Sequence, residues 1–170
     1  MPSIQQLFLR SAETAALPLW LVTESTLDEW RAGQSPQVVQ WLAASAFKAE
    51  RHRVLLLPKA DGSAAGAVLG LGRLKEPGEL SLWHTAGVGE KLPAADFQLA
   101  TPLPAAAAYQ AALGFAYGEY RFERYRSQNG RTLGTRRGPR LVVPQGCDLE
   151  RIERVAQALA LGRDLINTPA

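Results

Sequence analysis

The densest set of groups that could do chemistry is a run of arginines in the last third of the chain. Seven of them fall between residues 121 and 140: Arg121, Arg124, Arg126, Arg131, Arg136, Arg137 and Arg140. Guanidinium groups bind phosphate in a bidentate way, and aromatic side chains beside them can stack on bases. Tyr120, Phe122 and Tyr125 flank the first arginines, so nucleic-acid binding is one interpretation. The other is a solvated loop that contacts a domain or subunit, because no known nucleic-acid motif accompanies the cluster.

Histidine and cysteine, the usual nucleophiles, bases and metal ligands, are scarce. The chain has two histidines, His52 and His84, and one cysteine, Cys147. Neither histidine has a second one at the spacing of a helical zinc site, so we interpret each as a surface or hydrogen-bonded residue. Cys147 precedes a predicted helix start, which can lower a thiol pKa, but no histidine lies near it and we expect it to be inert. A single cysteine excludes an internal disulfide and favours a reducing, intracellular compartment.

Carboxylates are spread along the whole chain. A two-metal hydrolase needs several of them converging on a pair of ions, and no dense set is present. Glu119 and Glu123 lie four residues apart among arginines, which is typical of surface ion pairs. No serine lies in a G-x-S-x-G elbow. We therefore assign no catalytic, cofactor-binding or metal-binding residue to this chain.

Three glycines could suggest a phosphate-binding loop. Gly66, Gly70 and Gly72 follow one another closely. Their spacing does not meet the G-x-G-x-x-G pattern, and no helix opens after them as a dinucleotide site requires. Phosphate binding is therefore not favoured here.

Short apolar runs in the first half of the chain predict buried strands at 17–22, 53–58 and 67–72. A turn at Asp61 and Gly62 suggests that the last two pair as a hairpin. We expect an α/β domain, because helical segments alternate with these strands.

Two helices are predicted between the first and second strands. One is capped by Ser25 or Thr26, and the next begins at Ser35 with Pro36 in its first position. The second helix has an apolar face at helical spacing: Val38, Val39, Leu42, Ala43 and Ala46. Trp41 flanks that face and is interpreted as a core residue.

The second half predicts a short helix at 81–86, a strand at 97–99, a long helix from Pro104, a polar loop at 126–138 and a strand at 140–144. The long helix carries a stripe at steps of three and four: Ala105, Ala108, Tyr109, Ala112, Leu113, Ala116, Tyr117 and Tyr120.

A last helix is capped by Asp148 and has an apolar face of its own: Leu149, Ile152, Val155, Ala156 and Leu159. Gly162 is expected to interrupt it late, and Asn167 to Pro169 to end it.

Composition agrees with one globular domain. The chain has 170 residues, of which 46% are hydrophobic and 21% charged, with a net charge of +3. That length suffices for one domain with a core. No run of eighteen uncharged apolar residues exists, and the start lacks the features of a secretion signal.

Two segments resemble a known family. Residues 158–170 read ALALGRDLINTPA, and residues 113–125 read LGFAYGEYRFERY. The first is similar to the junction before the catalytic domain of leucyl aminopeptidases, with the signature A-R-D-L-x-N-x-P, although Gly162 replaces the usual alanine. The second is similar to the helix end G-x-x-x-G-x-Y-x-F-x-x-Y of the same family. The resemblance is close over the last third of the chain and loose elsewhere.

The resemblance implies an amino-terminal, non-catalytic domain with a central mixed sheet flanked by helices, similar to a macrodomain. Its expected division is a domain at 1–146 and a linker helix at 147–170 that leads to a catalytic domain outside this chain. The family is cytosolic and typically hexameric, and it removes amino-terminal residues from peptides with two divalent ions, zinc or manganese. Those ions and the catalytic residues belong to the catalytic domain, so this chain alone is expected to be inactive.

The implied partners are the chain's own catalytic domain, sister subunits and, for the parent enzyme, peptide substrates. Two other hypotheses stay open at the level of sequence. One is a freestanding module that binds a nucleotide such as ADP-ribose, and the other is nucleic-acid binding through the arginine cluster, for which the expected sign is a salt-dependent affinity.

Overall fold

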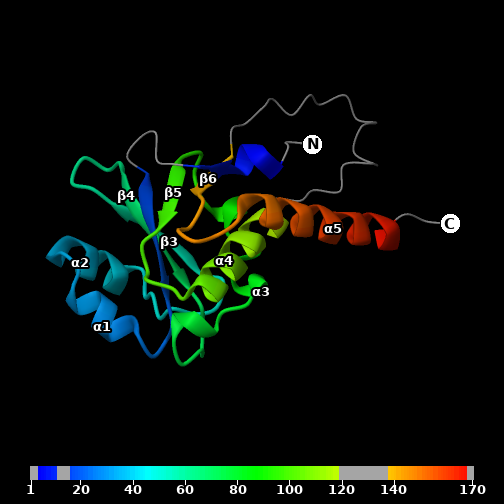
Figure 1. The fold of residues 1–170 in the computed structure, drawn as a ribbon. Helices are drawn as coiled ribbons and strands as arrows, with labels where there is room; N and C mark the ends of the chain where they lie inside the picture. The colour runs from blue at the N-terminus through cyan, green and yellow to red at the C-terminus, as the bar shows by residue number, and fades with distance from the viewer. Residues whose placement is uncertain (1–3, 11–15, 119–137, 168–170) are drawn as a thin grey trace.

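The protein is described from a computed structural model, which covers residues 4–10, 16–118 and 138–167. Figure 1 shows a central sheet with helices on both of its faces. The elements come in this order: η1 (Ile4–Leu7), β1 (Phe8–Leu9), β2 (Leu17–Val22), α1 (Leu27–Ala32), α2 (Pro36–Ala44), β3 (Val54–Pro58), β4 (Ala64–Gly70), η2 (Pro77–Glu79), α3 (Leu82–Thr85), η3 (Gly89–Lys91), β5 (Asp96–Leu99), α4 (Ala105–Gly118), β6 (Arg140–Val142) and α5 (Leu149–Asn167).

The sheet is mixed, as expected for this α/β chain. Its six strands lie in the order β1-β6-β5-β2-β4-β3. Among the strands of the described residues, only the β3–β4 hairpin is antiparallel, and every other neighbouring pair is parallel. Parallel neighbours need a crossover, and the helices supply it on either face.

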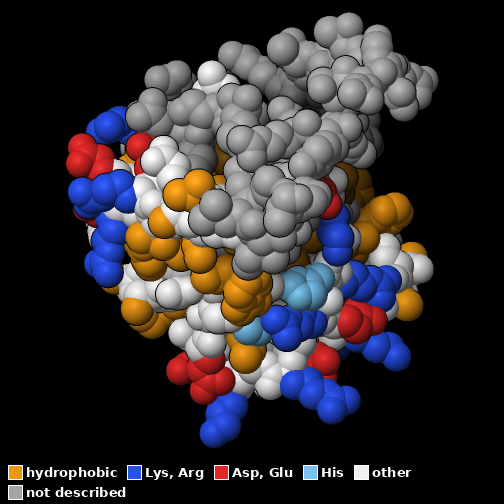
Figure 2. All heavy atoms as spheres, turned by 90° about the vertical axis from the view of Figure 1, so that its right-hand side faces the viewer, with side chains coloured by type: hydrophobic (Ala, Val, Ile, Leu, Met, Phe, Trp, Pro, Cys, Tyr) orange, Lys and Arg blue, Asp and Glu red, His pale blue; other side chains and the backbone are white. Residues whose placement is uncertain are grey.

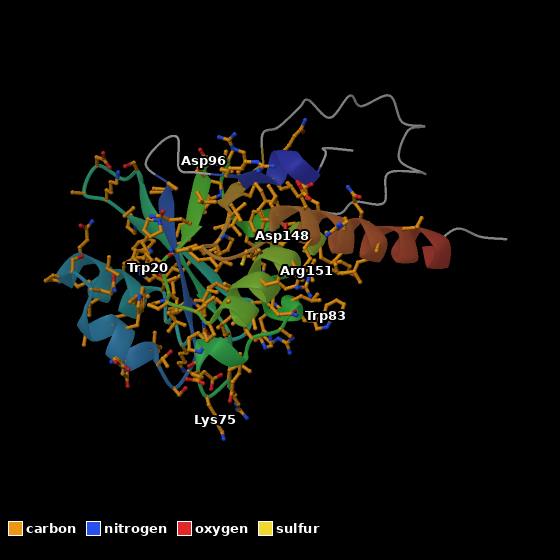
Figure 3. All side chains as sticks on the ribbon, in the orientation of Figure 1. Trp20, Lys75, Trp83, Asp96, Asp148 and Arg151 are labelled. Atoms are coloured by element: carbon orange, nitrogen blue, oxygen red, sulfur yellow. The ribbon has the colours of Figure 1, made fainter. Side chains whose placement is uncertain are left out.

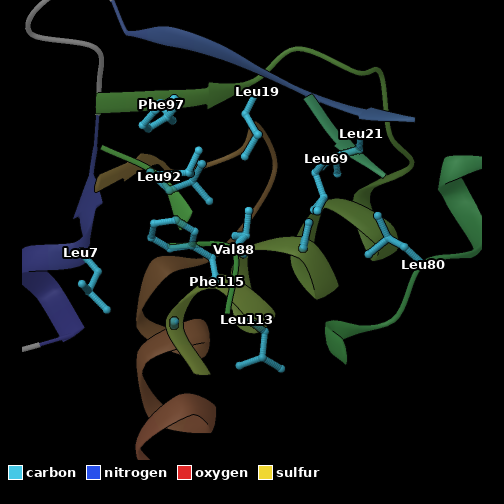
Figure 4. Packing of buried hydrophobic residues seen from close by; sticks show 14 of the residues in the cluster. Leu7, Leu19, Leu21, Leu69, Leu80, Val88, Leu92, Phe97, Leu113 and Phe115 are labelled. Carbon is cyan, nitrogen blue, oxygen red and sulfur yellow. The ribbon is translucent and has the colours of Figure 1, made fainter. Parts of the chain in front are cut away.

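Both faces of the sheet are buried, each by its own core. Along β2, Leu19 and Leu21 enter the larger core, while Val22 enters the smaller one and Trp20 packs against it. Alternate side chains of a strand point to opposite faces, so a run that is apolar at every position fits a sheet covered on both sides. The larger core lies under α4 and α5, and Figure 4 shows Phe97 and Phe115 within it. The smaller core lies under α1 and α2.

One strand expected to be buried lies at the edge of the sheet. β3 is the last strand of the order, and Leu56 on it is exposed. Trp41, expected in the core, is also exposed, and its indole Nε1 donates to the carbonyl oxygen of Leu56 at 2.9 Å. Both expectations were wrong because hydrophobicity alone does not distinguish an edge strand from a central one. The indole covers a carbonyl group that the edge would otherwise present to another strand.

Helix starts agree with the expected caps at two of three positions. Ser35 accepts from the backbone N–H of Val38 at 3.4 Å, with Pro36 in the first helical position. Asp148 accepts from the N–H groups of Glu150 and Arg151 at the start of α5. Thr26 precedes α1, but its hydroxyl bonds Thr23 instead of capping the helix. The caps therefore fix where α2 and α5 begin.

Two expectations about helix faces need correction. Ala43 and Ala46, placed on the apolar face of α2, are exposed, and Leu42 is the buried residue of that helix. Gly162 does not interrupt α5, which continues to Asn167. A glycine in a helix lowers its stability but does not by itself end it.

More residues of α4 are buried than the predicted stripe includes. Ala107, Ala111, Gly114 and Phe115 are buried although they lie outside that stripe. The helix packs against the sheet, α3 and α5, so its sides are covered as well as its inner face. Small residues on α4 permit this close packing.

Within the described residues, no helix is long and apolar enough to span a membrane.

Candidate functional site

The two histidines, 32 positions apart in sequence, lie near each other in the structure. His84 is buried on α3, where the backbone N–H of Ser81 donates to its Nδ1 at 3.1 Å and the Ser81 hydroxyl lies 3.1 Å from the same nitrogen. This is a capping box in which the histidine ring replaces the usual glutamate. Burial lowers the pKa of His84, which favours the neutral ring. His84 is thus a hydrogen-bonded structural histidine, as interpreted from sequence.

His52 has a different environment. Its backbone adopts φ +65°, and the ammonium group of Lys91 donates to its carbonyl oxygen at 2.5 Å. Burial lowers the pKa of His52, and the charges of Arg51, Lys91 and His84 lower it further. Lys91 and Arg51 are residues that sequence reasoning did not select, because nothing in their spacing links them to either histidine.

The close-set glycines serve packing rather than phosphate binding. A Cβ on Gly70 would lie 2.3 Å from the carbonyl oxygen of Glu50, and one on Gly66 would lie 2.7 Å from that of Pro18. Side chains at these positions would force backbone segments apart. Gly72 has φ +74°, a conformation that glycine adopts without strain.

A groove lies where α4 and α5 begin, beyond the carboxyl ends of β5 and β6. It has a volume of about 490 Å³. Its walls come from η2, the first turns of α4 and the start of α5: Gly78, Leu80, Ala105, Ala106, Ala107, Tyr109, Gln110, Gly146, Cys147, Asp148 and Arg151. In open α/β sheets, ligands bind beyond the carboxyl ends of the strands, so this groove is a candidate site by position.

The polar groups of the groove have structural partners. The Arg151 guanidinium lies 5.1 Å from the centre of the Tyr109 ring, and the Gln110 amide oxygen accepts from the N–H of Leu82 at 3.1 Å. Asp148 caps α5, as described above (Figure 3). Burial raises the pKa of the Cys147 thiol, which disfavours the reactive thiolate. The groove therefore offers one cation over an aromatic ring, with no arranged pair of an acid and a base.

The arginine cluster falls almost entirely outside the described residues, as do Glu119, Glu123 and the predicted loop at 126–138. Arg140 is described, and it forms a bidentate ion pair with Asp96 at 2.7 and 2.9 Å. The two residues are cross-strand partners on β5 and β6. Arg140 thus stabilises the sheet, and its side chain is not a free phosphate-binding group.

The described residues do not fit a pair of divalent ions. Among the described parts of the chain, no three histidine, cysteine, aspartate or glutamate side chains lie close enough to hold a metal ion. Asp96 and Glu50 each pair with an arginine. Two-metal chemistry cannot be built from these groups.

α5 extends beyond the rest of the domain (Figure 1). Ile152 and Ala156 in its first turns are buried in the larger core, and Leu161 further along is 59% exposed. The first turns of the helix are thus anchored in this core. The start of α5 packs into the larger core, and the expected division at residue 146 stays a prediction.

Comparison with known proteins gives one family match. The model of the N-terminal domain of M17 aminopeptidases matches residues 17–144. That range begins with β2 and ends just after β6, so it includes five of the six strands. A search of curated proteins finds no match.

Solved structures share the fold. A cytosol aminopeptidase from Coxiella burnetii superposes with a TM-score of 0.74 at 24% identity, over 96% of this chain and 34% of its own. A tomato leucine aminopeptidase variant superposes with a TM-score of 0.54 at 18% identity, over 96% of this chain and 38% of its own. The bottromycin maturation enzyme BotP, in complex with Mn, superposes with a TM-score of 0.53 at 22% identity, over 92% of this chain and 32% of its own. The chain spans about a third of the length of these proteins.

Proposed function

The chain belongs to the M17 aminopeptidase family as an N-terminal domain, and from this premise we propose that it serves a two-metal leucyl aminopeptidase without catalysing hydrolysis itself. The observation that carries the proposal is the family match across most of the sheet. The described residues do not fit a metal pair, so we assign the two ions, zinc or manganese, to a catalytic domain outside this chain. When bound there, such ions activate a water molecule and polarise the scissile carbonyl group.

In this proposal α5 is the linker helix. Residues 1–146 form the amino-terminal domain, and residues 147–170 lead to the catalytic domain. Because Ile152 and Ala156 are held in the core, the helix would transmit the orientation of this domain to the catalytic domain. A rigid connection of this kind favours a role in oligomer assembly or in shaping access of peptides to the active site.

Further parts of the proposal rest on the family. We expect the parent enzyme to act in the cytoplasm as a hexamer and to release amino-terminal residues from peptides. BotP in complex with Mn is one structural neighbour consistent with metal dependence in the family. The family match does not support the alternative of a freestanding nucleotide- or nucleic-acid-binding module.

Hydrolysis of leucine p-nitroanilide in the presence of manganese tests the proposal. We expect no hydrolysis by the 170-residue chain, because its described residues lack the groups that hold a metal pair. We expect hydrolysis by the complete gene product and its loss on chelation, with restoration by manganese as the control. Activity of the 170-residue chain, or a complete protein that stays inactive with every divalent ion tried, would contradict the proposal.

A further inference from the structure

A basic and aromatic surface lies on the side of the domain towards which α5 points. We call it the basic–aromatic surface, and it consists of Arg51, His52, Trp83, Lys91 and Tyr117, together with the small exposed part of His84. Figure 2 views the molecule from the side to which α5 extends in Figure 1. It shows the two histidine side chains close together, with basic side chains beside them and some acidic side chains further out. Trp83 lies on the same side in Figure 3. Separate segments of the chain therefore meet on this face.

The segment that carries Arg51 and His52 is held in a strained conformation. Three non-glycine residues within it have positive φ: Ala46, Ala49 and His52. The Arg53 guanidinium fixes the segment by donating to the carbonyl oxygens of Ser45 and Ala46 and to the carboxylate of Glu50. Positive φ outside glycine costs free energy, and such strain often occurs where a segment must present a side chain in a fixed position. The backbone that carries Arg51 and His52 is thus held in a fixed conformation.

The aromatic part of the surface is equally rigid. A Cβ on Gly114 would lie 2.1 Å from the carbonyl oxygen of Leu82, so α3 and α4 are in backbone contact. The Thr85 hydroxyl donates to the carbonyl oxygen of Ala111 at 2.9 Å. On this platform the rings of Trp83 and Tyr117 meet edge to face at 5.3 Å, yet Trp83 remains 52% exposed. A large aromatic side chain fixed in an exposed position is typical of a binding hot spot.

Two cations of this surface, Arg51 and Lys91, are without an ion pair among the described residues. Arg51 and Lys91 have no ion pair there, whereas Arg31, Arg53, Arg73 and Arg140 each have a carboxylate partner. Placing like charges together is unfavourable unless a partner of opposite charge covers them. The surface therefore fits a partner that carries carboxylates and an apolar pocket for Trp83.

We propose that the basic–aromatic surface docks against an acidic surface of the catalytic domain that comes after α5 in the same polypeptide. The inference rests on the proposed function. The relatives are about three times as long as this chain, and α5 carries the chain out on the side of this surface. The next domain is thus delivered to the face on which Arg51 and Lys91 have no ion pair with a described carboxylate. Docking there would fix the second domain at two places, the helix and the surface.

Photo-cross-linking in the complete protein tests the docking. Trp83 is replaced by p-benzoylphenylalanine, and Trp41 is replaced in a matched control, because Trp41 is also exposed but lies on the opposite face of the sheet. Mixing isotopically labelled and unlabelled protein separates links within one polypeptide from links between copies. We expect position 83, and not position 41, to cross-link to residues beyond 170 of the same polypeptide. Links from position 83 only to another copy, or no more downstream links than from position 41, would overturn the proposal.

A charge reversal gives an independent test. In the complete protein, Arg51→Glu should speed amide hydrogen exchange over α3 and η3 by up to about fivefold, the upper end for one lost surface ion pair. Lys59→Glu, an exposed reversal in the β3–β4 turn, is the control and should leave these amides unchanged. If the surface had no acidic partner, Arg51→Glu would relieve repulsion from Lys91, and exchange would stay the same or slow down. That result would also contradict the docking.

The two proposals can fail separately. A complete protein that hydrolyses leucine p-nitroanilide but gives no link from position 83 refutes the docking and leaves the aminopeptidase function. A protein that gives the link but has no peptidase activity with any divalent ion supports the docking to a downstream domain and refutes the activity.

Discussion

His52 and His84 share a region of positive charge with Arg51 and Lys91. Burial is the larger cause of the lowered pKa of each histidine, and neighbouring positive charge adds to it. In the folded chain both rings therefore favour the neutral form. In the unfolded chain both return to the ordinary histidine value of 6.5. The histidines thus couple folding to pH in the range where acidic side chains are still ionised.

We expect the free energy of unfolding to fall as pH falls below about 6.5. In that range the unfolded histidines bind more protons than the folded ones, so acid favours unfolding. The stabilisation that the neutral histidines contribute is fully present above pH 6.5. Urea denaturation of the 170-residue chain between pH 7.5 and 5.5 measures the loss, and the double variant His52→Gln, His84→Gln should lose less. Glu50 and Asp61, whose pKa values are lowered from 4.5 and 3.8, contribute only at lower pH. Equal losses in both proteins would contradict the assignment.

Two glycines that lie in helices, Gly114 and Gly162, have different roles in this domain. Gly114 on α4 touches the backbone of α3, whereas a Cβ on Gly162 of α5 would meet no atom within 4 Å. Alanine has the higher helix propensity at either position. Packing therefore decides whether a glycine-to-alanine change at Gly114 raises or lowers the free energy of unfolding. Helix propensity decides it at Gly162.

Gly114→Ala should lower the free energy of unfolding by about 2 kcal/mol or more, because the new methyl group would overlap backbone atoms of Leu82. Gly162→Ala should raise it or the helicity of α5, by at most about 1 kcal/mol. Urea denaturation followed by circular dichroism measures both variants. A stabilising Gly114→Ala would show that α3 and α4 can separate at little cost.

The whole molecule has two cores that share one sheet. Strand β2 contributes Leu19 and Leu21 to the larger core and Val22 to the smaller one. Neither core can lose its packing without disturbing the backbone that carries the other. The domain should therefore unfold as one unit, despite its division into two apolar clusters.

This expectation can be checked with separate probes. In a Trp83→Phe variant, the remaining tryptophans, Trp20, Trp30 and Trp41, all lie on the α1 and α2 side. Most of the helical signal in circular dichroism comes from α4 and α5. Urea transitions followed by fluorescence and by circular dichroism should coincide. Two separated midpoints would show that the faces unfold independently.

Element types were predictable from this sequence where the signal is local. The Ser35 and Asp148 caps set helix starts, and the run at 17–22 marked β2, because caps and apolar runs act through neighbouring residues. The resemblance in segments 113–125 and 158–170 indicated the family, and the family match confirmed it. β1 was not expected, since a two-residue strand carries no periodic signal. The exposure of Trp41 was also missed, because burial depends on which strand forms the sheet edge.

By itself, the sequence determined the mixed α/β class, the positions of most elements and the family. Backbone preferences, caps and apolar spacing are properties of short segments, so they located the elements. The family and the mixed sheet were implied by the resemblance of residues 113–125 and 158–170 to leucyl aminopeptidases. Only the tertiary structure decided that His52, His84, Arg51 and Lys91 share one face beside Trp83, and that Arg140 pairs with Asp96. Those contacts join residues up to 44 positions apart. Strand order and helix packing bring them together, and no local pattern encodes either.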